Sequence, residues 1–323
     1  MTRPLFLLSL PRAGSTLLQR MLMASGEVAT LGEPSLLLRF LGNDEIMTRR
    51  APYWDYLVSQ AMDDMRQASP GFDARYREGV RQLALGVYDE LAAGKPWFLD
   101  KTPRYSLIAD EIGRTFPDAR FIILWRHPLA VASSMCDTFC RGAWEVDDYA
   151  IDLHRGLDSL LGFAATHPDR IAEVRYEDLV SNPVAEMEKL ECYLGLSGLA
   201  AHARQPALTA GGSLGDPTGV VKYQGVSEQS REAWRSAYDN WGRRRWARRY
   251  FSNPERRASL AKLGYHLPPE MASTPWWQGS LVQGWRDWKS TIGTPKRLRQ
   301  GPRWQSRFVE KFHAKNGFPI GFQ

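Results

Sequence analysis

The feature that most constrains the fold is a short apolar run followed at once by turn residues. Residues 5–10, LFLLSL, are typical of a fully buried strand, and residues 15–25 repeat apolar side chains at helical spacing. Between them lies PRAGST, in which Gly14 permits a tight turn and Ser15 and Thr16 open the helix. Backbone N–H groups at a helix N-terminus favour bound anions. The stretch therefore predicts a strand–loop–helix unit with an anion site in its loop.

The same stretch has a second interpretation, as a secretory signal peptide. LFLLSL is shorter than a normal signal core and is interrupted by Pro11 and Arg12, so we expect no cleavage there. Three cysteines in 323 residues form no disulfide framework and fit a reducing compartment. No apolar run approaches the length that crosses a bilayer. We therefore expect a cytoplasmic protein without a transmembrane segment.

Further short apolar runs alternate with helical patterns along the chain. A short extended segment is expected at 29–38, strands at 96–103, 119–125 and 170–179, and helices at 53–93 (with a break), 105–115, 127–140, 148–166 and 182–196. This alternation implies a parallel sheet with right-handed crossovers. We expect an α/β fold, a P-loop-type parallel sheet flanked by helices, with helical insertions covering one side.

Composition shifts suggest how the chain is divided. We expect a single domain over residues 1–270, with a core at 5–195 and a loop with helices at 205–265, followed by a Trp- and Arg-rich extension at 271–323. The net charge of +6 favours an anionic ligand. No zinc-ligand spacing or basic zipper is present, so no nucleic-acid partner is expected.

A second anion site is indicated at the end of another strand. Arg126 follows the run ARFIILW, and Ser134 stands eight residues later, on the next helix. Ligands of open parallel sheets bind beyond the carboxyl ends of the strands, where an arginine can fork onto a phosphate. A surface salt bridge is the alternative for Arg126. The first loop lacks the pattern G-x-x-x-x-G-K-[ST], which argues against a Mg-ATP hydrolase.

Together these motifs resemble those of PAPS-dependent sulfotransferases, in the branch of tyrosylprotein sulfotransferases and bacterial small-molecule enzymes. Four segments stand in the family's order over roughly residues 5–195: PRAGSTLL (11–18), DKTPRY (100–105), RHPLAVASS (126–134) and RYEDLVSNP (175–183). Ala13 departs from the family pattern, which often has serine there. The resemblance implies transfer of a sulfuryl group from PAPS to an acceptor hydroxyl, with release of PAP and no metal.

The resemblance also implies which residues act. Glu33 would be the base, Lys101 would neutralise the transferring group, and Arg12 the leaving 5′-phosphate. Asp100 is the second candidate for the base, and an ion pair of Glu33 with Arg39 or Arg12 is the purely structural alternative. The implied nucleotide contacts are Arg12, Ala13, Gly14, Ser15, Thr16, Leu17, Arg126, Ser134 and Tyr176, with Ser213 and Lys222 in a Gly-rich loop at 211–222 that would close over the nucleotide.

The acceptor is open at this point. We expect a small molecule or biosynthetic intermediate with a hydroxyl, hydrophobic or carrier-bound, while an acidic protein substrate is an alternative. Aromatic residues outside the motifs are candidates for its pocket: Tyr53, Trp54, Tyr56, Trp144, Trp234, Trp241, Trp276 and Trp277. Two other functions stay in view, a P-loop kinase of a small hydroxyl compound and a non-catalytic nucleotide- or anion-binding protein. The oligomeric state is also open, a homodimer being one alternative.

Overall fold

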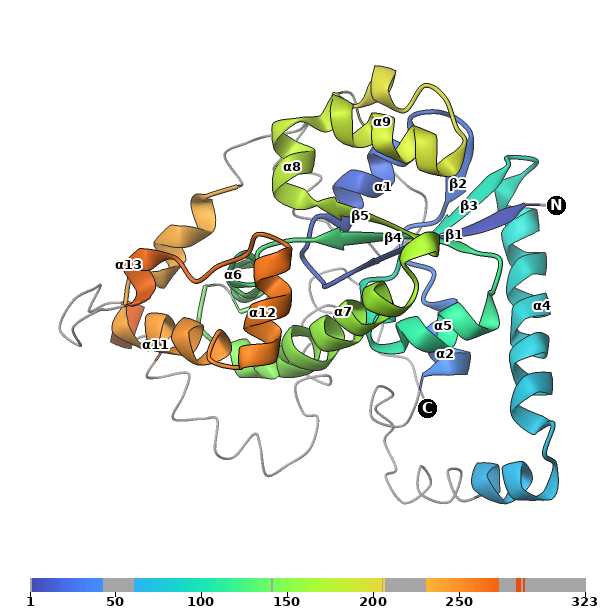
Figure 1. Ribbon diagram of the computed structural model, residues 1–323, viewed down its shortest axis with the longest axis horizontal. Coiled ribbons are helices and arrows are strands. Elements are labelled where there is room, and N and C mark those ends of the chain that lie inside the picture. The colour runs from blue at the N-terminus through green and yellow to red at the C-terminus, as the bar shows by residue number, and fades with distance from the viewer. Residues whose placement is uncertain are drawn as a thin grey trace, which may run out of the picture. The chain divides into compact units, whose positions relative to one another are not determined.

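The computed structural model contains a five-stranded parallel sheet in the order β2-β3-β1-β4-β5 (Figure 1). The structure describes residues 2–42, 61–140, 142–204, 206, 231–272, 283–285 and 287. The strands are β1 (Arg3–Ser9), β2 (Val28–Thr30), β3 (Trp97–Asp100), β4 (Arg120–Trp125) and β5 (Ile171–Arg175). The run LFLLSL thus provides the central strand, which is buried on both faces and apolar for that reason.

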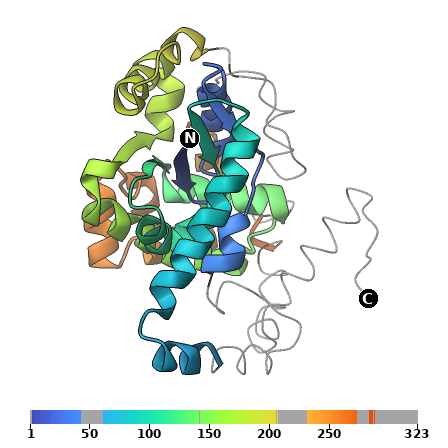
Figure 2. The ribbon, with the colours of Figure 1, turned by 90° about the vertical axis from the view of Figure 1, so that its right-hand side faces the viewer.

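Side chains alternate between the two faces of the sheet, and each face is covered by helices. Leu5 and Leu7 point to a layer formed by α1 (Ser15–Met23), α8 (Tyr176–Ser181) and α9 (Pro183–Leu194) (Figure 1). On the other face, the Phe6 ring contacts Tyr88 and Phe116. That face is covered by α4 (Phe72–Ala92), α5 (Ala109–Thr115) and α7 (Leu157–Thr166); Figure 2 shows α4 lying in front of the sheet.

The remaining segments of this part of the chain are short. Residues 61–68 are helical. The other elements are α2 (Leu36–Leu41), the 3₁₀ helices η1 (Pro103–Ile108), η4 (Pro168–Arg170) and η5 (Ala200–His202), and the π-helix η3 (Ile151–Gly156).

The expected α/β fold with a parallel sheet flanked by helices is confirmed, although several boundaries differ; for example, the strand expected at 96–103 ends at Asp100. The strand expected at 170–179 ends at Arg175, and Tyr176 begins α8. Glu177 and Asp178 fall in the first turn of that helix, where acidic side chains are favoured by the helix dipole. The extended segment expected at 29–38 ends early, because α2 begins at Leu36.

The chain forms two compact units. The sheet unit comprises Met1–Val131 and Ile151–Ala233, and the second unit comprises Ala132–Ala150 and Trp234–Gln323. Helix α6 (Pro128–Phe139) begins in the sheet unit and continues into the second. The second unit also holds η2 (Val146–Tyr149), η7 (Ala233–Tyr238, which starts one residue earlier), α11 (Trp241–Tyr250), α12 (Pro254–Lys262) and α13 (Pro269–Ala272). The expected boundary near residue 270 stays a prediction.

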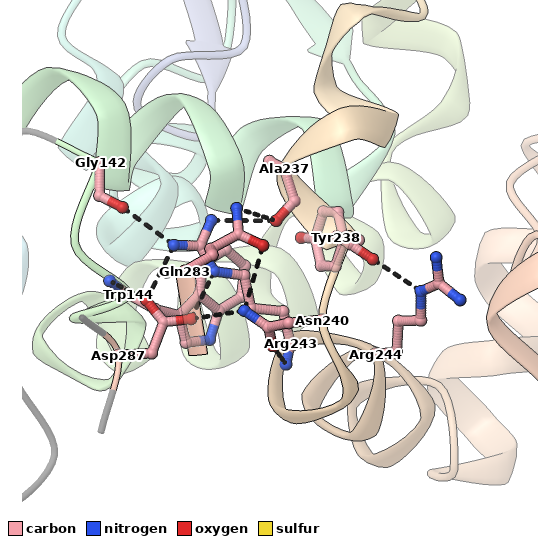
Figure 3. A network of polar contacts seen from close by, with 9 residues as sticks. All are labelled: Gly142, Trp144, Ala237, Tyr238, Asn240, Arg243, Arg244, Gln283 and Asp287. Carbon is pink, nitrogen blue, oxygen red and sulfur yellow. Dashed lines mark hydrogen bonds and ion pairs between the residues drawn. The ribbon is translucent and has the colours of Figure 1, made fainter. Parts of the chain in front are cut away.

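In the described part of the second unit, aromatic rings pack together and a buried ion pair joins Arg243 to Asp287. Tyr238 is fully buried, and the rings of Trp144 and Trp234 meet it edge-on. The Arg243 guanidinium donates to both carboxylate oxygens of Asp287, at 2.7 and 2.8 Å (Figure 3). Trp144 and Trp234 therefore belong to the core of this unit.

Among the residues that the structure describes, no helix has both the length and the apolar character needed to cross a membrane.

Candidate active site

The loop after β1 has the conformation of an anion cradle. Arg12 and Gly14 both have positive φ, 68° and 100°, and the N–H of Ala13 turns back to the carbonyl of Leu10. Helix α1 begins directly after it, with Gly14 at the N-cap position and therefore no side chain to cap the first turn. The first N–H groups of a helix have no intrahelical acceptor and carry the positive end of its dipole. The loop predicted from the sequence thus has the geometry that an anion needs.

Tyr176 and Arg126 support this loop from positions just after β5 and β4. A Cβ atom on Gly14 would lie only 2.5 Å from Cδ2 of Tyr176, so the ring occupies the space beside the glycine. The Arg126 guanidinium lies over the Tyr176 ring, 4.2 Å from its centroid, and donates a 2.8 Å hydrogen bond to the carbonyl of Arg12. The structure therefore brings together Arg12, Gly14, Arg126 and Tyr176 at the carboxyl ends of β1, β4 and β5.

Glu177 was not singled out in the sequence, yet it connects two of the motifs. Its Oε1 accepts a 2.9 Å hydrogen bond from the N–H of His127, the residue just before α6. Glu177 is almost fully buried. This hydrogen bond thus connects the start of α6 to the start of α8. In the sequence, only the position of Glu177 next to Tyr176 could have pointed to this role.

Glu33 and Lys101 form an ion pair at the ends of two adjacent strands. Lys101 directly follows β3, Glu33 follows β2 by three residues, and Lys101 Nζ lies 2.9 Å from Glu33 Oε1. The Lys101 side chain has no exposed surface, whereas that of Glu33 is 26% exposed. A buried ammonium requires a counter-charge, and Glu33 supplies it from a side chain that is itself partly exposed. The ion pair of Glu33 is thus with Lys101, and among the described residues no pair joins Glu33 to Arg39, one of the two partners expected for a purely structural role.

Asp100 lies beside Lys101 but faces the other way. It is completely buried, and its Oδ2 accepts hydrogen bonds from the hydroxyls of Tyr88 at 2.5 Å and Tyr105 at 2.9 Å. Burial raises the pKa of Asp100 to about 6, against the pull of these hydrogen bonds. An acceptor hydroxyl cannot reach a carboxylate enclosed in this way, so the geometry favours Glu33 as the base.

The other residues implied by the resemblance are distributed as follows. Ala13 and Ser15 are buried in the loop, and Thr16 and Leu17 are partly exposed. Ser134 is partly exposed on the part of α6 that belongs to the second unit. Ser213 and Lys222 lie outside the described residues, as do Tyr53, Trp54, Tyr56, Trp276 and Trp277.

No group of three or more His, Cys, Asp or Glu side chains that could hold a metal ion occurs in the parts of the chain that the structure describes. The expectation of a reaction without metal stays a prediction.

Comparison with known proteins agrees with this fold and loop. The sequence pattern of the family described as "Sulfotransferase family" matches residues 4–200. The chain therefore belongs to the sulfotransferase family, and the resemblance seen in its motifs is confirmed. The expected enzyme class, a transferase of this family, is confirmed with it.

Individual relatives are more distant. The chain is 28% identical over 261 residues to nodulation protein NoeE of Sinorhizobium fredii, an alignment that covers 72% of this chain and 59% of NoeE. The chain thus spans only about three fifths of the length of NoeE.

Two solved structures share the fold. The sulfotransferase domain from the curacin biosynthetic pathway has a TM-score of 0.56 and 21% identity, covering 83% of this chain and 99% of that one. The sulfotransferase domain from the Synechococcus PCC 7002 olefin synthase has a TM-score of 0.54 and 23% identity, covering 83% and 96%. At these identities the likeness concerns the fold.

Proposed function

We propose that this chain transfers a sulfuryl group from PAPS to the hydroxyl of a small molecule or biosynthetic intermediate and releases PAP. The observation that carries the proposal is the contact between the partly exposed side chain of Glu33 and the buried Lys101, which puts a carboxylate and an ammonium at the ends of neighbouring strands. The same edge of the sheet carries the loop at Arg12 and the side chain of Arg126. A proton acceptor and three cations at one edge suit the transfer of an anionic group.

In this reaction Glu33 takes the proton of the acceptor hydroxyl while the oxygen of that hydroxyl forms a bond to sulfur. The bond between sulfur and the bridging oxygen of the 5′-phosphate breaks, and that oxygen leaves with the electron pair as part of PAP. Lys101 offsets negative charge on the transferring group, and Arg12 offsets the charge that develops on the leaving phosphate. Lys101 can supply this stabilisation without moving, because its side chain is held in place by burial.

The nucleotide would be held by residues of both anion sites. The loop at 12–17 would bind the 5′-phosphosulfate through its backbone N–H groups and Arg12. Arg126 and Ser134 would bind the 3′-phosphate, with Tyr176 beside the nucleotide, and Ser213 and Lys222 would cover the phosphates. The close approach of Tyr176 to Gly14 supports this reading, because it puts the Tyr176 ring directly beside the anion loop.

Proteins of the same fold suggest a class of acceptors to test. Two proteins of this fold act in a biosynthetic pathway and in an olefin synthase, as their names state. We therefore include carrier-bound hydroxyacyl chains, besides soluble hydroxyl compounds, among the acceptors of this chain. We also propose that it works in the cytoplasm.

Thermal unfolding with different nucleotides tests the donor. A ligand that binds only the folded protein raises Tm by mass action, so PAP should raise it and ATP with Mg²⁺ should not. Preferential stabilisation by ATP with Mg²⁺ would instead indicate a kinase.

Incubation with sulfur-labelled PAPS tests the reaction. Metabolite extract and carrier-bound hydroxyacyl substrates are supplied separately, and acceptor-dependent PAP release is measured together with the labelled product. Binding of PAP with no release of PAP from PAPS in either mixture would identify a nucleotide-binding protein and contradict the proposal.

A further inference from the structure

The segment that carries Glu33 is held in place by two side-chain hydroxyls from the segment after β3. We call residues 31–37 the base segment. The N–H of Ser35 donates to Thr102 Oγ1 at 3.0 Å, and the N–H of Leu37 donates to Tyr105 Oη at 3.0 Å. The two contacts lie two and four residues beyond Glu33, so they fix the chain that follows the carboxylate.

Both hydroxyls converge on Asp100. Tyr105 Oη lies 2.9 Å from Asp100 Oδ2, and Thr102 Oγ1 lies 3.4 Å from Oδ1. A backbone N–H can only donate, so each hydroxyl accepts from the base segment and has its own proton to give to Asp100. The donors therefore run in one direction, from the base segment through each hydroxyl to one carboxylate.

Burial makes this arrangement stiff. Asp100 and Tyr105 have no exposed surface and Thr102 is 2% exposed, so a lost hydrogen bond would leave a polar group unsatisfied away from water. Ser35 has a positive φ of 54°, a left-handed conformation that a residue other than glycine keeps only where its surroundings hold it. The hydrogen bond to Thr102 is one of the contacts that hold it.

We propose that Asp100 is a positioning residue for Glu33: through Thr102 and Tyr105 it fixes residues 35–37 and so sets where the Glu33 carboxylate stands against Lys101. Asp100 and Lys101 are adjacent in the chain. The end of β3 therefore supplies both the cation that contacts Glu33 and the carboxylate that holds Thr102 and Tyr105 in place. The inference rests on the proposed function in one respect, the role of Glu33 as the base.

A second tyrosine provides a matched control. Tyr88, on α4, donates to the same oxygen of Asp100 at 2.5 Å, and it is as buried as Tyr105. Its hydroxyl does not connect Asp100 to the base segment. Tyr88→Phe and Tyr105→Phe therefore remove the same group from the same carboxylate, and only the second breaks the path to residues 35–37.

The test compares Tyr105→Phe and Thr102→Val with Tyr88→Phe. We measure kcat, the acceptor KM, the dissociation constant for PAP, and amide hydrogen exchange of residues 33–38 without ligands. We expect kcat to fall about tenfold or more in the first two variants, because small displacements of a catalytic group are costly. The affinity for PAP should stay within about twofold, since the anion loop is untouched. Exchange at residues 35–37 should be faster in those two variants and unchanged in Tyr88→Phe.

Asp100→Asn separates positioning from acid–base chemistry. Asparagine keeps an oxygen for the two tyrosines and can donate to Thr102, so we expect it to retain most of the turnover and the slow exchange. Loss of turnover with unchanged exchange would show that Asp100 is the base and would overturn the inference. Equal effects of Tyr88→Phe and Tyr105→Phe, or unchanged exchange in Tyr105→Phe and Thr102→Val, would also overturn it. Because exchange needs no substrate, a wild-type protein that binds PAP but transfers no sulfate would contradict only the proposed function.

Discussion

A lysine without exposed surface needs a nearby negative charge, because the cost of burying an unpaired ammonium exceeds what most folds can absorb. Lys101 finds this charge in Glu33, 2.9 Å away. The pair has two properties at once: it stabilises the buried lysine, and the Glu33 side chain in it stays partly exposed. A substitution at Glu33 should therefore affect both turnover and stability, and the two effects can be measured separately.

Glu33→Gln should abolish most of the turnover while leaving the nucleotide bound. An amide cannot take the proton of the acceptor, and loss of a general base lowers kcat by roughly 10²- to 10⁴-fold. PAP release measures kcat, and calorimetry measures the dissociation constant for PAP, which should stay within about twofold because the anion loop is intact. Glu27→Gln, the same change on the other side of β2, is the control and should behave as wild type. Full activity of Glu33→Gln would remove Glu33 from its proposed role.

Asp100 should make stability depend on pH in a defined window. Its pKa is raised from 3.8 to about 6 in the folded protein by burial, so the folded state holds the proton more tightly than the unfolded one. Compared with Asp100→Asn, the wild-type protein therefore gains up to roughly 3 kcal/mol in its free energy of unfolding from this group. The gain is fully present below about pH 4 and is lost as the pH rises through 6. Tyr88 and Tyr105, which face Asp100, stay neutral over this pH range because burial raises their pKa well above 10. The charge of Lys101, the next residue, acts in the opposite direction to burial and lowers the pKa of Asp100.

Denaturant unfolding of both proteins between pH 4 and pH 7 measures this difference. A difference that stays constant across the range would show that Asp100 has the same pKa in the folded and unfolded chains.

At the scale of elements, the anion loop depends on Gly14 for two reasons. Its φ of 100° is left-handed, and a Cβ there would meet the ring of Tyr176. Gly26 also has a positive φ, 77°, but nothing lies within 4 Å of the position of its Cβ. The two glycines separate the cost of the backbone conformation from the cost of the contact.

Gly14→Ala should therefore weaken nucleotide binding, whereas Gly26→Ala should not. Each variant loses about 1–2 kcal/mol of stability from the left-handed conformation. Only Gly14→Ala also displaces Tyr176 and the Arg126 that lies over it, and we expect PAP affinity to fall by about tenfold or more, equivalent to 1.4 kcal/mol. Titration with PAP measures it. Equal affinities in the two variants would show that the Tyr176 contact does not support the loop.

The elements with strong local signals could be predicted from the sequence. LFLLSL and RFIILW are short, apolar and bounded by polar or turn residues, so their burial as parallel strands followed from the pattern. Four motifs in order then identified the family, and the resemblance to it implied roles for Glu33, Lys101 and Arg126. Their contact in space could not be derived from spacing, because Glu33 and Lys101 are 68 positions apart.

Other features depend on packing that no local pattern encodes. The sequence RIAEVRYEDL (170–179) predicts a strand throughout, yet Tyr176–Ser181 is helical, and the chain turns there from the sheet towards α9. Tyr88 and Tyr105 look like ordinary core aromatics in the sequence. Only the fold shows that both hydroxyls meet one buried carboxylate, since Tyr88 lies on α4 and Tyr105 on η1.

For the whole molecule, the second unit depends on one ion pair near the C-terminal end of what the structure describes. Arg243 is 4% exposed and Asp287 14%. Asp287 also accepts from Asn240 Nδ2 at 2.8 Å, and Arg243 donates to the carbonyls of Gly142 and Ala237 at 2.9 Å (Figure 3). The network thus connects three stretches of the second unit that are far apart in the sequence.

Asp287→Ala should destabilise the second unit strongly, because it leaves the Arg243 guanidinium buried without its counter-charge. We expect a loss of about 3 kcal/mol, the lower end for a broken buried pair. Glu270→Ala, which removes the exposed pair with Arg235, should cost less than about 1 kcal/mol. Denaturant unfolding followed by tryptophan fluorescence compares the two. Similar losses would mean that the Arg243–Asp287 pair contributes no more than a surface contact.

The strand order has a consequence for how the chain is made. β1 lies in the middle of the sheet, where Leu5 pairs with Leu99 on one side and with Arg120 on the other. At ribosomal rates of about 5–20 residues per second, these partners emerge many seconds after β1. Throughout that interval this apolar central strand has neither neighbour. Newly synthesised chains should therefore rely on chaperones until β4 has left the ribosome, and recombinant yield should respond more to slower expression than to surface substitutions.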